Sequence, residues 1–179
     1  MRQAVVFAIG VGLAGAALVA GQASQVTKDT VPGILNFARV ETSVACAGAT
    51  TPDAMVAIKR LGFVSVINLR LATEAGADVD AEAAAARAAG LRHVHLPFNG
   101  ALPDQAVVDQ FLVAIREPMN LPVFIHCATG NRAAAMWMVK RVKVDGWDVG
   151  KAGDEAAALG LTSSPLKRFV LDYLLAHPR

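Results

Sequence analysis

Short apolar runs alternate with segments of helical pattern along most of this chain, and the alternation limits the folds it can adopt. The runs FVSVINLR (63–70), LRHVHLPF (91–98) and VFIH (123–126) each have the length of a buried strand. Segments such as AEAAAARAAG (81–90) separate them and end at a glycine, as helices commonly do. Strands that alternate with helices predict an α/β fold, in which helices cover both faces of a central, mostly parallel sheet.

The remaining elements follow from caps and periodicity. We expect two short opening strands, a helix after Thr51-Pro52 that ends at Gly62, and a helix that starts at Pro103. Further helices are expected at 131–144, at 149–159 and from 164 onward. Ligands of such folds bind at the carboxyl ends of the strands, so the loops that follow the strands are the places to look for a site.

The first 23 residues, MRQAVVFAIGVGLAGAALVAGQA, have Arg2 ahead of an unbroken apolar run and small residues near Ala23. This pattern is typical of a cleaved signal peptide, and an uncleaved membrane anchor is the alternative. We therefore expect a signal peptide at 1–23, a linker at 24–33 and one domain at 34–179, located in the periplasm or secreted. No other segment of the sequence is expected to span a membrane.

Composition excludes several classes of protein. The chain has 179 residues, of which 54% are hydrophobic and 18% charged, and this suits a single globular domain. A formal net charge of +2 gives no reason to expect a nucleic-acid partner or an anionic membrane surface. Two cysteines, Cys46 and Cys127, do not make a disulfide scaffold.

The segment VFIHCATGNRAAAMW (123–137) carries the chemistry. Cys127 follows a strand and precedes a helix, where inward-facing amides and the helix dipole favour an anion. Such surroundings favour the thiolate, which is the nucleophilic form of cysteine. Gly130 permits the backbone turn, and Arg132 offers a bidentate fork to a tetrahedral oxyanion. The sequence predicts phosphoryl transfer at this loop, although a buried cysteine that only packs is the alternative.

The other residues of the loop are expected to bind the substrate. We expect Ala128, Thr129, Gly130 and Asn131 to present backbone N–H groups to it. We expect His126 to orient the loop from behind, with its ring holding a backbone group.

These motifs resemble the beta-lactamase-hydrolase-like protein phosphatases, bacterial relatives of the dual-specificity and tyrosine phosphatases. The resemblance includes four segments in the family's order: TTPDAMVAIKRLGFVSVINLR, AAAARAAGLRHVHLPF, HCATGNRAAAMW and AAALGLTSSPLKRFVLDYL. It implies a phosphatase-like fold, Cys127 as nucleophile, Arg132 as phosphate clamp and a cysteinyl-phosphate hydrolysed by water. It also implies that neither a metal nor another cofactor takes part.

Three features depart from the wider tyrosine-phosphatase pattern. Four residues separate Cys127 from Arg132 in place of five, a spacing similar to that of rhodanese-type sulfurtransferases, and Ala133 replaces the usual Ser or Thr. Asn99 and Gly100 stand where the family carries its general-acid aspartate. Asp104 is the nearest carboxylate that could serve as the acid, and an ordinary place in the first turn of a helix is the alternative.

Several other residues allow more than one interpretation. His93, His95 and His126 could form a metal site, but packing is the simpler role. Cys46 could form a regulatory disulfide with Cys127 if their Cα atoms lie within about 7 Å. The charged residues after VINLR, which are Arg70, Glu74, Asp78 and Asp80, either rim the pocket or are solvated. Lys140, Arg141 and Lys143 are expected to form a solvated face.

The sequence therefore predicts a cysteine-dependent hydrolase of phosphomonoesters, whose substrate is a phosphorylated protein or a small phosphate ester. It predicts no nucleic-acid partner, and a membrane only if residues 1–23 are not cleaved. The alternatives are sulfur transfer by the same cysteine and a catalytically weak module that binds oxyanions.

Overall fold

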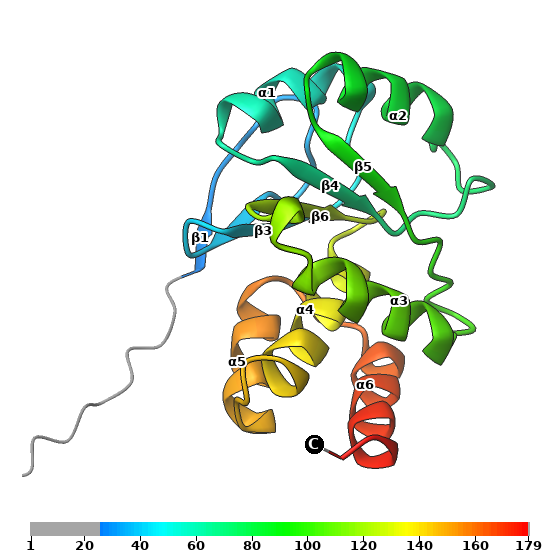
Figure 1. Cartoon of the computed structure of the whole chain (residues 1–179). Coiled ribbons are helices and arrows are strands. Elements are labelled where there is room, and N and C mark those ends of the chain that lie inside the picture. Colours follow the sequence, from blue (N-terminus) through cyan, green and yellow to red (C-terminus); the bar gives the residue numbers. More distant parts are fainter. Residues whose placement is uncertain (1–25, 179) are drawn as a thin grey trace, which may run out of the picture.

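A computed structural model describes residues 26–178 and confirms the predicted α/β architecture (Figure 1). A single sheet has the strand order β1-β2-β3-β6-β4-β5. Its strands are β1 (Val26–Lys28), β2 (Ala38–Val40), β3 (Val44–Ala47), β4 (Ser65–Asn68), β5 (Arg92–His95) and β6 (Val123–His126). The neighbouring strands β3, β6, β4 and β5 are parallel, whereas β1 and β2 add an antiparallel edge.

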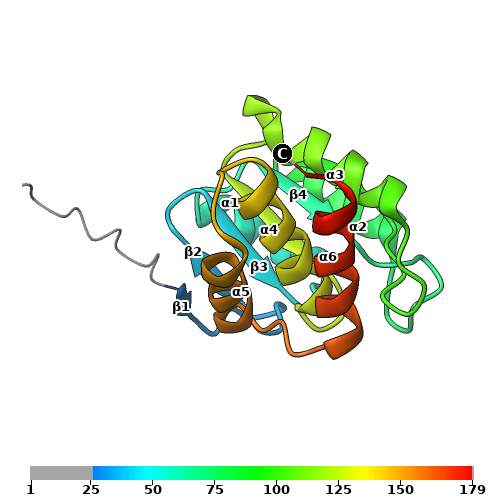
Figure 2. The same ribbon diagram turned by 90° about the horizontal axis from the view of Figure 1, so that it is seen from below.

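Helices cover both faces of the sheet. The helices α1 (Met55–Arg60) and α2 (Val79–Ala88) lie on one face. On the other face lie α3 (Gln105–Arg116), α4 (Asn131–Lys143), α5 (Val149–Ala158) and α6 (Ser164–Ala176). Figure 2 shows α5, α4 and α6 side by side in front of the sheet, with α4 in the middle. Two 3₁₀ turns, η1 (Pro52–Ala54) and η2 (Pro118–Asn120), complete the elements.

The two faces of the sheet bury separate hydrophobic cores, because successive side chains of a strand point to opposite faces. On β6, Phe124 packs with α1 and α2, whereas Ile125 packs with the larger core on the α4 side. The same alternation places His126 on the Phe124 face and Cys127 in the core with Ile125. The nucleophile candidate and the residue before it therefore belong to opposite sides of the sheet.

Two sequence expectations need correction. The segment expected to be a linker contains β1, which pairs with β2 from Val26 onward, and Val26 packs against the larger core. Arg141, expected in a solvated face, is buried and contacts Glu155, Glu41 and Asp145. The predicted signal peptide lies outside the described residues, and export remains a prediction. Within residues 26–178 no helix is long and apolar enough to cross a membrane.

Candidate active site

The segment from Cys127 to Arg132, called here the cysteine loop, joins the carboxyl end of β6 to the start of α4. Strand β6 lies between β3 and β4, so the loop sits at the middle of the parallel part of the sheet. Loops at this position project from the edge where ligands of α/β proteins bind. The loop also runs into the first turn of α4, whose free amides and dipole favour an anion.

Hydrogen bonds hold the carbonyl groups of the loop away from its centre. Ala128 O accepts from the Ala49 amide at 2.9 Å, and Thr129 O accepts from Asn36 Nδ2 at 3.1 Å. Gly130 adopts φ 99°, a backbone conformation that residues other than glycine rarely adopt. Its amide donates to Cys127 Sγ at 3.1 Å. The loop thus directs a backbone N–H group at the sulfur.

Cys127 is fully buried, at 0% exposure. A cavity of about 380 Å³ lies beside the loop and is lined by nine residues: Leu71, Glu74, Asn99, Gly100, Thr129, Asn131, Arg132, Ser163 and Leu166. Cys127 is not one of them. A ligand in this cavity would therefore meet Arg132 before it reached the sulfur.

Arg132 points into the protein. Its Nη1 donates to Leu69 O at 3.0 Å and to Phe98 O at 2.8 Å, and the carboxylate of Glu74 bridges Nη1 and Nη2 at 2.6 and 2.8 Å. All these bonds use Nη1 and Nη2. Burial would lower the pKa of Arg132, but the adjacent Glu74 and Cys127 raise it above its usual value. The guanidinium is thus permanently charged and held beside the sulfur.

Glu74 is the residue that holds Arg132 in place. Burial alone would raise the pKa of this carboxyl, but hydrogen bonds from Arg132, the Leu71 amide and Arg70 lower it to about 2. Glu74 is therefore ionised at neutral pH. The sequence leaves open whether Arg70 and Glu74 rim the pocket or are solvated. Glu74 does line the cavity, and Arg70 Nε lies 3.4 Å from Glu74 Oε2.

His126 was expected to hold a backbone group, and this expectation is wrong. Its Nε2 lies 2.9 Å from Glu82 Oε1, while its Nδ1 is buried with no hydrogen-bond partner in the described structure. The same oxygen of Glu82 also lies 2.9 Å from His93 Nε2 and accepts from Asn68 Nδ2 at 3.1 Å. Sequence reasoning missed Glu82, and the available signal was a carboxylate directly followed by a run of four alanines in α2.

Glu82 is a buried carboxylate shared by three strands. Burial would raise its pKa, but hydrogen bonds from His126 and His93 lower it to about 2. Glu82 thereby links α2 to β4, β5 and β6 immediately behind the cysteine loop. We call Glu82, Asn68, His93 and His126 the buried carboxylate cluster.

The histidines are not arranged around a metal. His93 and His126 share Glu82, and His95 Nε2 lies 2.8 Å from the carbonyl oxygen of Arg70. Within residues 26–178, no group of three or more His, Cys, Asp or Glu side chains has a geometry that could hold a metal ion. Each histidine instead has a protein partner.

The remaining predicted residues lie in different places. Asn99 and Gly100 line the cavity, as expected for the loop after β5. Asp104 is exposed and caps α3 by accepting from the Ala106 amide at 2.9 Å, outside the cavity lining. This position favours the capping role. Asn131 faces the turn between α5 and α6, where its Oδ1 accepts from the amides of Thr162 and Ser163, both at 2.8 Å.

Cys46 lies on β3, next to β6. Both cysteines are free and buried in the structure. Burial, and after it the neighbouring Cys127, raises the pKa of Cys46 far above the ordinary value, so this thiol stays protonated. The regulatory disulfide remains a prediction.

Comparisons with known proteins identify the family. The sequence model of the phosphatase-like domain of beta-lactamase hydrolase-like proteins matches residues 36–144. A beta-lactamase hydrolase-like protein of Xylella fastidiosa (strain Temecula1 / ATCC 700964) is 34% identical over 119 residues, which are 65% of this chain and 26% of that protein. The chain thus spans about a quarter of the length of the curated relatives it matches.

Solved structures agree on the fold. TpbA of P. aeruginosa superposes with a TM-score of 0.66 at 22% identity, over 88% of this chain and 92% of that one. The core catalytic domain of the PP-IP phosphatase SIW14 of S. cerevisiae gives a TM-score of 0.63 at 18% identity, over 79% and 87% of the two chains. From the sequence match and the shared fold, we conclude that this chain belongs to the phosphatase-like domain family of the beta-lactamase hydrolase-like proteins.

Proposed function

We propose that this protein hydrolyses phosphomonoesters of the tyrosine or dual-specificity type through a cysteinyl-phosphate. The sulfur of Cys127 forms a bond to phosphorus, and the ester P–O bond breaks with its electron pair leaving on the alcohol or phenol oxygen. Water then attacks phosphorus, releases inorganic phosphate and restores the thiolate. The observation that carries this proposal is the Gly130 amide directed at Cys127 Sγ beside the inward-facing guanidinium of Arg132.

The cavity offers the leaving group no acid. Among the nine described residues that line it, Glu74 is the single carboxylate, and Arg132 keeps it ionised. Loss of general acid catalysis typically costs 10²- to 10⁴-fold in rate. The reaction should therefore favour esters whose alcohol leaves easily. Aryl phosphates such as phosphotyrosine fit this requirement better than alkyl phosphates.

A relative supports the choice of an aryl phosphate. A structure of a TpbA variant, with a TM-score of 0.64 at 21% identity, contains phosphotyrosine. The same fold thus accommodates this ester in another protein. A phosphorylated protein or a small aryl phosphate is the substrate class that we propose for this chain.

The direct test is phosphate release from a series of aryl and alkyl phosphates with rising leaving-group basicity. We expect slow turnover of 4-nitrophenyl phosphate, a steep fall toward alkyl esters, and no turnover with Cys127→Ser. A kcat/KM that does not depend on the leaving group would refute the absence of an acid. Turnover of thiosulfate with a thiol or cyanide acceptor, and of no phosphate ester, would assign the cysteine to sulfur transfer instead.

A second candidate function is oxyanion binding without turnover. The observation that favours it is the complete burial of Cys127 behind Arg132. In that case no substrate of either kind would react, yet phosphate or sulfate would raise the melting temperature, and Arg132→Ala would remove the effect. Protection of Cys127 from iodoacetamide by phosphate separates the two functions further. If Cys127 is the nucleophile, iodoacetamide must be able to alkylate its sulfur. In a module that only binds oxyanions, Cys127 can remain unreactive toward iodoacetamide.

A further inference from the structure

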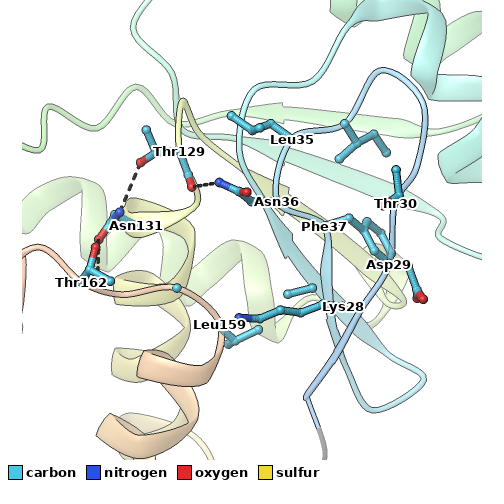
Figure 3. A pocket seen from close by; sticks show the side chains of 13 residues that line it. Lys28, Asp29, Thr30, Leu35, Asn36, Phe37, Thr129, Asn131, Leu159 and Thr162 are labelled. Carbon is cyan, nitrogen blue, oxygen red and sulfur yellow. Dashed lines mark hydrogen bonds between the residues drawn. The ribbon is translucent and has the colours of Figure 1, made fainter.

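A second cavity lies beside the cysteine loop. It has a volume of about 670 Å³, and we call it the side pocket (Figure 3). Its walls come from residues 28–30, from residues 34–38, from the cysteine loop, and from Leu159, Gly160 and Thr162. Thr129 and Asn131 line both the side pocket and the cavity above Arg132. The two cavities are therefore neighbours that share part of the cysteine loop as a wall.

The cysteine loop itself holds both walls of the side pocket. On one side, Asn36 adopts a left-handed conformation with φ 51°, and its side chain donates to Thr129 O. On the other, Asn131 accepts from the backbone of Thr162 and Ser163. A left-handed non-glycine residue costs free energy and persists where its surroundings require it. These bonds make the side pocket preformed, which lowers the entropic cost of filling it.

Among the residues that the structure describes, the side pocket offers apolar contact and one cation without an ion-pair partner, Lys28. Leu35 is 49% exposed and presents an aliphatic side chain. Lys28 reaches across the pocket toward Leu159, whereas the carboxylate of the adjacent Asp29 points away (Figure 3). No residue in the described part of the chain forms an ion pair with Lys28. A negatively charged group in the pocket would supply the missing partner.

We propose that the side pocket binds the leaving-group portion of a phosphate ester that carries a second negative charge, which Lys28 pairs. The proposal rests on the function proposed above and adds a substrate class to it: esters with a carboxylate or a second phosphate beyond the phosphate at Arg132. The walls on either side supply the apolar and hydrogen-bonding contacts for the group between the two charges.

Binding tests this without requiring turnover. The probes are benzylphosphonates with a para chain of varying length that ends in a carboxylate, each compared with its neutral methyl ester by calorimetry. We expect the best carboxylate to bind about fivefold more tightly than its ester, as for an exposed ion pair, and Lys28→Met to abolish the difference. Arg60→Met, which removes an exposed charge from α1, is the matched control and should preserve it. Equal affinity of acid and ester at every length would overturn the proposal.

Kinetics then distinguishes the sources of the second charge. Phosphotyrosine peptides with Glu or Gln next to the phosphorylated residue are compared with an aryl phosphate that carries a second phosphate. A Lys28-dependent preference for the Glu peptide points to an acidic protein segment, and a preference for the bisphosphate points to a small molecule. If no ester turns over, the proposed function fails, while the phosphonate affinities still decide on the side pocket.

Discussion

The carboxylate of Glu82 provides the sharpest prediction, because Glu82→Gln changes its charge and preserves its shape. The native pKa is about 2, against an ordinary value of 4.5. A carboxyl whose pKa is lower in the native state stabilises the protein fully at pH values above its unfolded-state pKa. This contribution is lost as the pH falls through the native-state pKa. A difference of about 2.5 pKa units corresponds to about 3 kcal/mol in the free energy of unfolding.

The pH window follows from the same two values. The unfolded pKa is 4.5, so the contribution of Glu82 to the free energy of unfolding falls mainly below pH 5. Between pH 5 and pH 3 it decreases by about 2 kcal/mol. We expect urea denaturation of the native sequence to show this loss relative to Glu82→Gln, so that the two stabilities converge as the pH falls. At pH 7 the variant should be less stable, since a neutral amide replaces charge-assisted hydrogen bonds to His93 and His126.

Asp80→Asn is the matched control, because Asp80 is an exposed carboxylate on the same helix. It should leave the pH dependence between pH 5 and pH 3 close to that of the native sequence. The reasoning would be refuted by a difference between native protein and Glu82→Gln that stays constant from pH 7 to pH 3. Such a result would mean that the buried carboxylate cluster does not depend on the charge of Glu82.

Three further predictions concern the cysteine loop and the packing of α4 against α5. Gly130→Ala should cost about 1–2 kcal/mol in urea denaturation, because φ 99° disfavours a side chain, whereas Gly153→Ala within α5 should stabilise by about 0.5–1 kcal/mol. Asn131→Ala should speed amide hydrogen exchange at 162–163, since two backbone donors lose their acceptor; unchanged exchange would contradict its role. Arg141→Met should destabilise by about 3–5 kcal/mol in the same denaturation assay, because Glu155 would keep a buried charge without its guanidinium partner. A much smaller loss would show that Arg141 contributes little.

The helices and strands were predictable because their signals are local. Asp148 and Ser163 cap α5 and α6 by accepting from amides three residues later, and Gly160 adopts a positive φ after α5. The alternation of strands and helices likewise implied a mostly parallel sheet, which the structure confirms. Even the position of Cys127 at a carboxyl strand end followed from the order of elements.

Arg141 shows where local signals fail. Its neighbours Lys140 and Lys143 suggested a solvated stripe, yet its guanidinium lies 4.6 Å from the Trp137 ring centroid and 4.1 Å from that of Trp147, and it contacts the buried carboxylate of Glu155. Packing of α5 against α4 supplies that environment. The side pocket is a similar case, because its walls come from opposite ends of the chain.

The pattern of residue types along the chain was enough to identify the fold and to place the cysteine loop between a strand and a helix. The partners of the reactive groups were not predictable in this way. Glu82 lies 44 residues from His126, and Glu74 lies 58 residues from Arg132. Caps and periodicity depend on neighbours within a few residues, whereas a contact between distant side chains exists only once the strands and helices that carry them have packed together.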